Sequence, residues 1–409
     1  MKTFARCAGS VLALSLTVPA ALPFGPSGVA QAQDSSAAQS VPQGGQDAAD
    51  KIRMLRSIKM PPGFHIALYA LVPSARSLAI DPVSGDVFVG TRKDFVWRIH
   101  KPGPGQAEVT SFEPQVGFKD PNGVCFAPDG TMFVVELNRV LKFDPETDGD
   151  NTPAEHDIVA QDHLIPTKFA IYNHGARVCT VGPDNRLYMA LGEPINVMPK
   201  EDYDIFYKAG MGAINVINQD GSDRQVYAHG LRNSVGVAFS PVDHTLWFTD
   251  NQVDGMGDDQ PPGELNHATK AGENFGYPWY GGGHTRTVLW KDTTPPEGVV
   301  FPVVETIAHA ADLGLTFYTG GPFPSRYRDG LFSVQHGSWN RTVPVGARVL
   351  FTHVEPDGSA HMTVFASGWL KPDHSYQGRP VDVKEMKDGS LLVSDDFGGA
   401  VYRITYTGK

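Results

Sequence analysis

The fold is decided by a phrase that reads APDGTMFVVE from residue 127 and is followed from residue 139 by RVLKF. A Pro-Asp-Gly turn precedes a run of mostly apolar residues, and a second apolar run follows after a short gap. Turn residues next to strand-like runs of this length are typical of a β-hairpin. The stretch therefore predicts a pair of antiparallel strands.

The same phrase recurs along the chain, with further copies that begin at Asp81, Gly182, Ser240, Asp329 and Lys387. Six copies, spaced roughly 45 to 90 residues apart, are typical of a β-propeller. We therefore predict an all-β fold, a six-bladed β-propeller that forms one domain over residues 51–409. The pattern leaves one alternative open, a β-sandwich with unrelated hairpins. The only plausible helical pattern covers residues 48–58, and the longest loops are expected between residues 250 and 319.

The composition agrees with a turn-rich globular chain. Its 44 glycines and 32 prolines make up about 19% of 409 residues, against a usual ~12%. Its 34 basic and 45 acidic residues give a formal charge of −11. This balance argues against binding to nucleic acids or to anionic membranes, because both require a basic surface.

The first 32 residues have the three-part pattern of a secretory signal peptide. Lys2 and Arg6 precede an apolar run over residues 11–22, and small residues end at Ala30-Gln31-Ala32. The apolar run is too short to span a bilayer, and a buried N-terminal helix is the alternative. We expect residues 1–32 to be removed and the protein to be periplasmic or secreted, without a membrane span. Loss of two basic residues would bring the charge to −13.

Cys125 and Cys179 are the two cysteines of the expected mature chain. In an oxidising compartment they can form one disulfide, and two buried free thiols are the alternative that the sequence leaves open. There is no Cys-x-x-Cys-His motif, so no c-type haem is attached. Residues 33–50 are small and polar, and they predict a flexible linker.

Polar and cationic residues stand just before the first strand of each predicted blade. They are Arg76, Asn122, His174 with Arg177, Arg232 with Asn233, Asp312, and Arg379. Each one alone is more commonly a surface arginine or a loop-capping histidine. Their repeated placement would gather them around the channel of a propeller, and convergent polar groups at a concave mouth are the default location of a binding site. In an acidic chain, this ring predicts an anion-binding site.

Six stretches of the sequence are motifs of a known kind. They are KMPPGF from residue 59, YNHGARVCTVGPDNRLY from 172, HGLRNSVGVAFSP from 229, ELN from 264, GENFGYP from 272 and GRPVDV from 378. Together they resemble the quinoprotein soluble sugar dehydrogenases, closest to their L-sorbosone dehydrogenase branch. The similarity runs from about residue 55 to the end, and the RN and NFGYP blocks are its most specific parts.

This resemblance implies a propeller that holds pyrroloquinoline quinone (PQQ) and Ca²⁺. His174 would be the general base that takes the substrate proton, since an imidazole suits proton removal near neutrality. Arg232 would stabilise the negative charge that grows on the quinone. Bidentate guanidinium groups suit the three carboxylates of PQQ. The candidate cofactor-binding residues are Asn233, Arg379, Arg341, His336 and Arg76.

The loop over residues 250–259 is rich in the oxygen ligands that Ca²⁺ prefers. The candidate metal ligands are Asp250, Gln252, Val253, Asp254 and Glu264. The loop departs from the pattern of the family, which has Glu-x-Gly-Pro followed by Asp-Glu-Ile-Asn. Here Asp250 replaces the Glu, Gln252-Val253 replace Gly-Pro, and Gly263 replaces the Asp before Glu264. A solvated acidic loop is the alternative.

The resemblance implies a small sugar substrate, such as an aldose or L-sorbosone, and a separate electron acceptor, either a cytochrome or the quinone pool. Two other functions remain open: a calcium-dependent sugar-lactone hydrolase, which predicts an acidic rim, and a non-catalytic binding propeller. Trp339 in the HGSWNR segment could face a sugar or cofactor, or could pack under the rim. The YPWYGGG segment from residue 277 leaves the same choice between substrate wall and loop packing.

Overall fold

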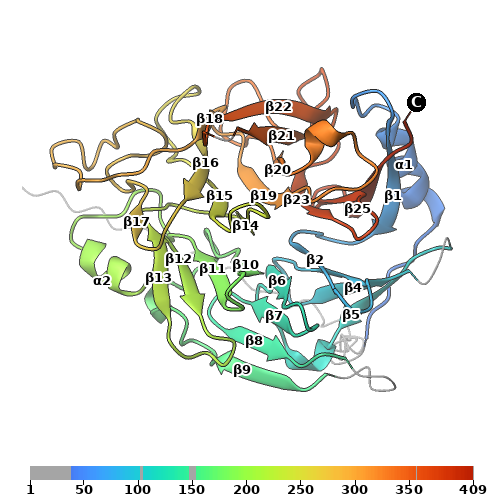
Figure 1. The fold of residues 1–409 in the computed structure, drawn as a ribbon, viewed down its shortest axis with the longest axis horizontal. Helices are drawn as coiled ribbons and strands as arrows, with labels where there is room; N and C mark the ends of the chain where they lie inside the picture. Colours follow the sequence, from blue (N-terminus) through green and yellow to red (C-terminus); the bar gives the residue numbers. More distant parts are fainter. Residues whose placement is uncertain (1–37, 102–104, 147–152, 356, 409) are drawn as a thin grey trace, which may run out of the picture. The chain divides into compact units, whose positions relative to one another are not determined.

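Six small sheets contain all 25 strands of the computed structural model, which describes residues 38–101, 105–146, 153–355 and 357–408. Five sheets have four strands, and one has a short fifth strand. Figure 1 shows the sheets side by side around a common centre. The predicted all-β fold, a six-bladed β-propeller, is confirmed, and each of the six turn phrases lies in a different blade.

The first three blades follow one another along the chain. Blade one contains β2 (Leu78–Ile80), β3 (Val87–Val89), β4 (Val96–His100) and β5 (Glu108–Phe112). Blade two contains β6 (Gly123–Phe126), β7 (Met132–Val135), β8 (Val140–Phe143) and β9 (Glu155–Val159). Blade three contains β10 (Val178–Val181), β11 (Leu187–Leu191), β12 (Ala213–Ile217) and β13 (Gln225–His229), beside which β17 (Glu273–Asn274) pairs in parallel.

The other three blades complete the ring. Blade four contains β14 (Gly236–Phe239), β15 (Leu246–Asp250), β16 (Gly263–Ala268) and β18 (Val304–Thr306). Blade five contains β19 (Asp312–Phe317), β20 (Leu331–Gln335), β21 (Arg348–Val354) and β22 (Ala360–Ser367). Blade six contains β23 (Pro380–Glu385), β24 (Leu391–Asp395), β25 (Ala400–Tyr406) and, as its outer strand, β1 (Phe64–Leu71).

The first strands of the six blades form a closed circle. β2 contacts β6, β6 contacts β10, and the contacts continue through β14, β19 and β23 back to β2. Because each blade is an antiparallel meander, the loops before its first strand and between its second and third strands lie at the same rim. Loops from distant parts of the sequence therefore meet around one end of the channel.

The circle is closed by strands from the two ends of the described chain. β1 pairs with β25 in antiparallel register, from Phe64 opposite Tyr406 to Leu71 opposite Ala400. Blade six thus combines three strands from the C-terminal part with one from the N-terminal part. This pairing covers the outer edge of β25 and joins the two ends of the described chain in one blade.

The turn residues of the repeated phrase explain its hairpins. In blade two, Gly130 has φ +94°, a left-handed conformation that favours glycine, and Asp129 Oδ1 accepts the N–H of Thr131 at 3.0 Å. Asn185 of blade three and Gly389 of blade six have φ +61° and +75° at the matching positions. The Asp-Gly and Asp-Asn pairs therefore set the tight reversals between first and second strands.

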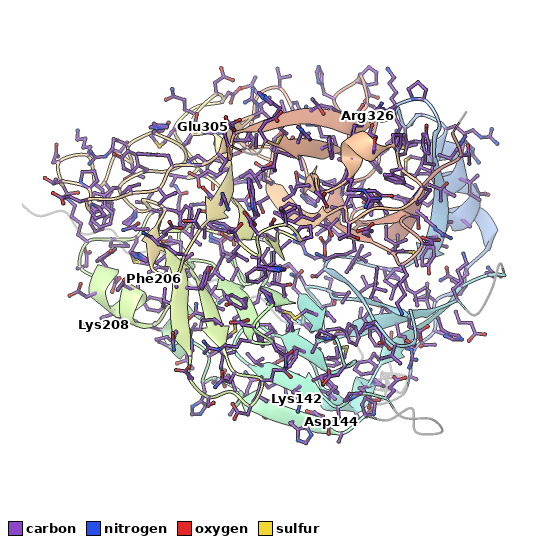
Figure 2. The ribbon with its side chains drawn as sticks, viewed as in Figure 1. Lys142, Asp144, Phe206, Lys208, Glu305 and Arg326 are labelled. Carbon is purple, nitrogen blue, oxygen red and sulfur yellow. A yellow bond between two sulfur atoms is a disulfide. The ribbon has the colours of Figure 1, made fainter. Side chains whose placement is uncertain are left out.

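Apolar side chains between neighbouring blades form the core, and charged side chains lie outside. Phe64 packs its ring 4.7 Å from that of Phe323 and 4.8 Å from that of Phe365, which joins blades five and six. Lys142 and Asp144 form a 3.4 Å ion pair at the outer edge of blade two (Figure 2). Middle strands such as β7 and β11 are buried along their whole length, as expected for strands covered on both faces.

Cys125 of β6 and Cys179 of β10 form a disulfide, with 5.8 Å between their Cα atoms. The bond joins the first strands of blades two and three and links positions 54 residues apart. The sequence left free thiols open as an alternative, and the structure selects the disulfide.

The N-terminal region differs from its prediction. The predicted signal peptide, residues 1–32, lies outside the described residues. Of the predicted linker, residues 38–50 are not free chain: Val41 donates its N–H to Val109 O at 2.9 Å, and α1 spans Gly45–Leu55. Helix α1 begins and ends three residues before the predicted range, because Ala48 and Leu55 are its buried residues. A second short helix, α2 (Tyr203–Lys208), was not predicted. Neither described helix is long and apolar enough to cross a membrane.

Candidate active site at the channel mouth

A pocket of about 510 Å³ lies at the rim where the loops meet. Its lining combines loops before first strands with loops between second and third strands. The lining residues are Arg76, Arg92, Asn173, His174, Ala176, Asn196, Arg232, Asn233, Val235, Asn251, Gln252, Asp254, His309, Ala311, Leu313 and Trp339. Three guanidinium groups face one carboxylate in this lining, so the pocket is cationic in an acidic protein.

His174 stands in the loop before β10 with φ +50°, and its ring is fixed from one side. Nδ1 lies 2.6 Å from the carbonyl oxygen of Glu193. Because a carbonyl oxygen only accepts hydrogen bonds, Nδ1 carries the proton, and Nε2 keeps its lone pair. Burial lowers the pKa of His174 to about 3, and the charges of Arg232, Arg92 and Arg177 add to this effect. His174 is therefore neutral at pH 7 and can accept a proton at Nε2.

Arg177 holds the His174 loop from beneath. Its side chain is only 1% exposed, and its Nη1 donates to His174 O at 3.1 Å and to Gly192 O at 3.2 Å. Gly192 itself must lack a side chain, since a Cβ there would lie 2.9 Å from His174 O and 2.5 Å from Asn233 Oδ1. The backbone around His174 is therefore locked to blade three by a buried guanidinium and a close approach.

Arg232 is held by acceptors on several sides. Its side chain is 4% exposed; Nη2 donates to Asp254 Oδ2 at 3.0 Å and to Asn196 Oδ1 at 2.9 Å. Nε donates to Asn196 O at 3.0 Å, and Nη1 to Asn251 O at 3.3 Å. The guanidinium is thus fixed in the pocket wall before any ligand binds.

Asp250 supports this arrangement from below. Its carboxylate accepts the backbone N–H groups of Arg232 and Asn233 at 2.8 and 2.7 Å, and the hydroxyl of Ser234 at 3.1 Å. The structure therefore gives Asp250 a positioning role for the Arg232 loop that the sequence did not reveal.

Other predicted metal ligands lie close to Asp250. Glu264 is its partner across β15 and β16. Burial raises the pKa of Asp250 to about 6 and that of Glu264 to about 8, and the nearby Asp250 charge raises the latter further. Gln252 is 6% exposed, and its Oε1 has no hydrogen-bond partner in the described part of the chain. All three residues line a small cavity of about 10 Å³.

The remaining predicted metal ligands are used differently. Asp254 accepts hydrogen bonds from Arg232 and from Asn340 Nδ2, the latter at 2.7 Å. Val253 has a buried apolar side chain, and its N–H bonds Gly281 O at 2.6 Å. Within the described ranges, no group of three or more His, Cys, Asp or Glu side chains is arranged to hold a metal ion.

Of the predicted cofactor residues, Asn233 and Arg76 line the pocket, whereas Arg379, Arg341 and His336 do not. Arg379 donates to His336 O at 3.1 Å and to the carbonyl oxygens of Gly337 and Ser338. Arg341 donates to backbone oxygens and to Asp259 Oδ1 at 3.0 Å. Both arginines therefore brace rim loops, and neither lines the pocket.

His336 belongs to a network next to the pocket. Its Nε2 lies 2.8 Å from Asp396 Oδ1, and Asp396 also accepts a hydrogen bond from Arg76 Nη1. Arg76 Nε donates to Asn122 Oδ1 at 2.9 Å. His336 can therefore act on the pocket only through Asp396 and Arg76.

The sequence left the roles of two aromatic segments open. Trp339 is 75% exposed at the mouth, so it does not pack under the rim. Tyr277 is 6% exposed; its hydroxyl donates to Glu193 Oε2 and accepts the N–H of Met198 at 2.7 Å. Tyr277 is thus a packing residue behind the site.

Six polar residues of the site were not predicted from the sequence: Arg92, Asn173, Asn196, Asn251, His309 and Glu193. Arg92 and Asn196 stand in loops between second and third strands, at the same rim as the loops before first strands. Their position in the repeated phrase, between its second and third strands, could have identified them. Glu193 acts through its backbone carbonyl, which gives no signal in a sequence.

Glu193 provides a test of this geometry through stability. Burial raises the pKa of its carboxyl to about 8 from an ordinary 4.5, so it is protonated at pH 7. Its stabilising contribution is complete below pH 4.5 and is lost as pH rises to 8, by about 1.4 kcal/mol for each pH unit. We expect Glu193→Gln, which resembles the protonated form, to flatten the fall in unfolding free energy between pH 5 and pH 8. Denaturant titrations that gave parallel pH profiles would contradict this.

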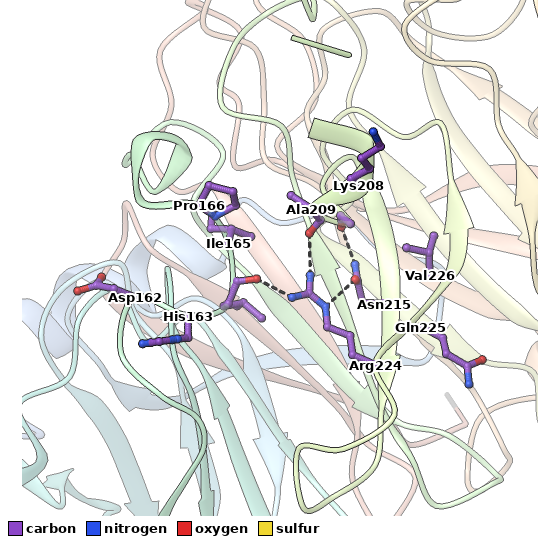
Figure 3. A pocket seen from close by; sticks show the side chains of 12 residues that line it. Asp162, His163, Ile165, Pro166, Lys208, Ala209, Asn215, Arg224, Gln225 and Val226 are labelled. Atoms are coloured by element: carbon purple, nitrogen blue, oxygen red, sulfur yellow. Dashed lines mark hydrogen bonds between the residues drawn. The ribbon is translucent and has the colours of Figure 1, made fainter. Parts of the chain in front are cut away.

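A second pocket of about 500 Å³ shares no lining residue with the first (Figure 3). At its centre, Arg224 donates to Leu164 O at 2.6 Å, to Ala209 O at 3.0 Å and to Asn215 Oδ1 at 3.0 Å. Because all three nitrogens of its guanidinium already have acceptors, Arg224 acts as a brace between the loop after β9 and the end of α2.

Known proteins resemble this chain in sequence and in fold. Residues 137–403 match the family model described as glucose/sorbosone dehydrogenase. A relative from Borreliella burgdorferi, described as an uncharacterized protein, is 29% identical over 363 residues, which cover 86% of this chain and 91% of the relative.

Solved structures share the fold at low sequence identity. A Trichoderma reesei protein of Carbohydrate-Active Enzymes Family AA12 has a TM-score of 0.69 and 20% identity, over 86% of this chain and 98% of that one. The PQQ domain of a Coprinopsis cinerea pyranose dehydrogenase has a TM-score of 0.66 and 17% identity, over 85% and 97%. The soluble aldose sugar dehydrogenase of Escherichia coli has a TM-score of 0.59 and 16% identity, over 84% and 100%.

Proposed function

Since the chain belongs to the glucose/sorbosone dehydrogenase family, we propose that it oxidises a sugar or sugar aldehyde, of the aldose or L-sorbosone type, with PQQ bound in the channel-mouth pocket. The single observation that carries the proposal is the pairing of His174 and Arg232 in that pocket. An imidazole with an unprotonated Nε2 and a fixed guanidinium line the same 510 Å³ space. The imidazole can take the proton of an alcohol, and the guanidinium can stabilise the negative charge that develops as a hydride passes to a bound acceptor.

The lining fits a flat, anionic cofactor. Three guanidinium groups, five side-chain amides and one carboxylate surround the space, and a tricarboxylate is matched by cations and amide donors. Gln252 Oε1, which lacks a partner among the described residues, offers a further polar contact. Arg232, Asn233 and Arg76 are the predicted residues that would hold PQQ. When bound, PQQ would supply the two-electron acceptor that takes the hydride.

His174 would take the proton of the reacting hydroxyl at Nε2. The carbonyl of Glu193 holds Nδ1–H at 2.6 Å and so fixes the ring in the tautomer that can accept. The substrate carbon would lose a hydride and its oxygen a proton, which leaves a carbonyl group. Arg232 would stabilise the negative charge that develops during the transfer, without reorganisation, because Asn196, Asn251 and Asp254 already fix its guanidinium.

The proposal includes Ca²⁺ because three oxygen-bearing side chains surround one small cavity. Two buried carboxylates, Asp250 and Glu264, and the unpartnered oxygen of Gln252 surround a cavity large enough for a single water or ion. This donor set fits Ca²⁺, and backbone oxygens would have to complete the coordination.

The location and the partner also follow from the sequence. We propose that residues 1–32 direct export to the periplasm or the medium. The sequence has no c-type haem motif, so a separate cytochrome or quinone would take the electrons.

The proposal is tested by reconstitution. Purified protein free of cofactor would receive PQQ and Ca²⁺ and would be assayed with artificial electron acceptors on a panel of aldoses and on sorbosone. We expect a change in PQQ absorbance, a rise in melting temperature and turnover of at least one sugar. Absence of all three would overturn the function. Hydrolysis of sugar lactones without PQQ would instead favour the hydrolase, although the cationic lining argues against the acidic rim that it predicts.

The binding of Ca²⁺ is tested in the same experiment with the variant Glu264→Gln. We expect Ca²⁺ to raise the melting temperature of the cofactor-free wild-type protein but not that of this variant. Glu108→Gln, which removes one exposed carboxylate on β5, is the matched control and should respond as the wild type does. An equal response of both variants would remove Ca²⁺ from this cavity.

A further inference from the structure

Arg92 lines the pocket but has no role in the proposed reaction. It stands in the loop between β3 and β4 of blade one, whereas Arg232 precedes β14 of blade four. In a ring of six blades, blades one and four lie opposite each other. His174 comes from blade three, and the charges of Arg232 and Arg92 both lower its pKa. Two cations on opposite sides of the channel therefore act on the same imidazole.

The guanidinium of Arg92 is held in place but keeps donors for a ligand. Its central carbon lies 3.5 Å from the centroid of the Tyr172 ring, and Nη2 donates to Tyr172 O. Nε faces Asp120 Oδ2 at 3.6 Å, beyond hydrogen-bond distance. Nη1 donates to no protein group among the described residues.

The charges of the three pocket arginines are paired to different extents. Arg232 has Asp254 at 3.0 Å, and Arg76 has Asp396 at 2.5 Å. Arg92 has only the more distant Asp120, a buried carboxylate whose two oxygens accept no hydrogen bond in the described chain. Arg92 is thus the least neutralised cation in the lining.

Exposure places Arg92 at the mouth and Arg232 at the floor. Arg232, Gln252 and Asn251 are 4%, 6% and 9% exposed, as expected for groups that hold a resident cofactor. The Arg92 side chain is 21% exposed, and the adjacent Tyr172 is 60% exposed. A substrate must enter and leave through the mouth, so it meets Arg92 first.

We propose that Arg92, with the exposed amide of Asn173 beside His174, forms a substrate subsite that binds the carboxylate of a sugar acid. The protein would then prefer a uronate to the matching neutral aldose, because a guanidinium binds a carboxylate through two parallel hydrogen bonds. The oxidation of a sugar acid at this subsite rests on the proposed function, whereas the binding of its carboxylate does not.

The experiment compares D-glucuronate with D-glucose, which differ only in a carboxylate in place of a hydroxymethyl group. Binding to the cofactor-free protein is measured by calorimetry, and kcat/KM is measured after reconstitution with PQQ. Two ratios of glucuronate to glucose are compared, that of the binding affinities and that of the kcat/KM values. We expect Arg92→Gln to lower each ratio about 10- to 100-fold, as for a lost hydrogen bond to a charged group. Affinity for PQQ should stay within about twofold of wild type.

Arg326→Gln is the matched control, since it removes one exposed arginine, labelled in Figure 2, from the β19–β20 connection. Connections between first and second strands lie at the rim opposite the pocket. It should leave both ratios unchanged. An unchanged ratio in Arg92→Gln would overturn the subsite, and so would a loss of PQQ affinity of tenfold or more, because Arg92 would then bind the cofactor. If glucuronate binds in an Arg92-dependent way while reconstitution gives no turnover, the subsite stands and the proposed oxidation fails.

Discussion

Replacing His174 with alanine is expected to lower kcat by about 10²- to 10⁴-fold, the usual contribution of a positioned general base. PQQ affinity should change little, because the side chain of His174 bonds the protein only through Nδ1 to Glu193 O. The measurement is steady-state turnover of the reconstituted enzyme on its best sugar, together with a PQQ titration. The wild-type pH profile of kcat/KM should show no inflection near pH 6.5, because the pKa of His174 is lowered to about 3.

Ile171→Ala serves as the control for a change in the same loop that leaves the imidazole in place. Ile171 is 44% exposed and does not line the pocket. Turnover of His174→Ala within a factor of about three of wild type would remove His174 as the base. Loss of PQQ binding in the same variant would move His174 from proton transfer to cofactor binding.

Removal of the disulfide should produce the largest loss of stability among single covalent changes. The chain-entropy model gives about 4 kcal/mol for a closed loop of this size, since the bond links positions 54 residues apart. For the double variant Cys125→Ala/Cys179→Ala, this corresponds to a fall of about 5 °C in melting temperature. Alanine is preferred to serine because Cys125 is 7% exposed and lies in an apolar cluster.

Wild-type protein unfolded in the presence of a reductant is the control, and it should show the same shift as the double variant. If the double variant has the same melting temperature as the oxidised wild type, the disulfide does not constrain the unfolded chain. A similar loss in a single Cys125→Ala variant is expected, because either substitution breaks the same bond.

The fold could be predicted because it repeats. Most of the turns place Gly, Asn or Asp where the backbone needs a left-handed residue, as at Gly130 and Asn185, whereas blade four has His244 there. Six copies of a local rule thus specify a global ring. Closure by β1 and β25 has no such local signal. The structured part of the predicted linker was missed for a related reason: residues 38–50 are polar, and what orders them is a distant partner such as Val109.

The site was predictable only in part. His174, Arg232 and Asn233 precede first strands, and the structure brings them to one pocket. The sequence could not show that the donors of Arg379 are occupied by the backbone around His336, because carbonyl oxygens are the same in every residue. Nor could it distinguish Asp250 as a metal ligand from Asp250 as the acceptor for the Arg232 loop.

The pairing of β1 with β25 also constrains when this molecule can fold. β1 precedes every other strand of the propeller along the chain, and its partner β25 follows all of them. A nascent chain therefore cannot close its ring until β25 has been synthesised. For a chain that is to be exported, as residues 1–32 predict, this delay keeps the polypeptide unfolded enough to pass through an export channel. The same seam is the natural place where loss of either end would open the propeller.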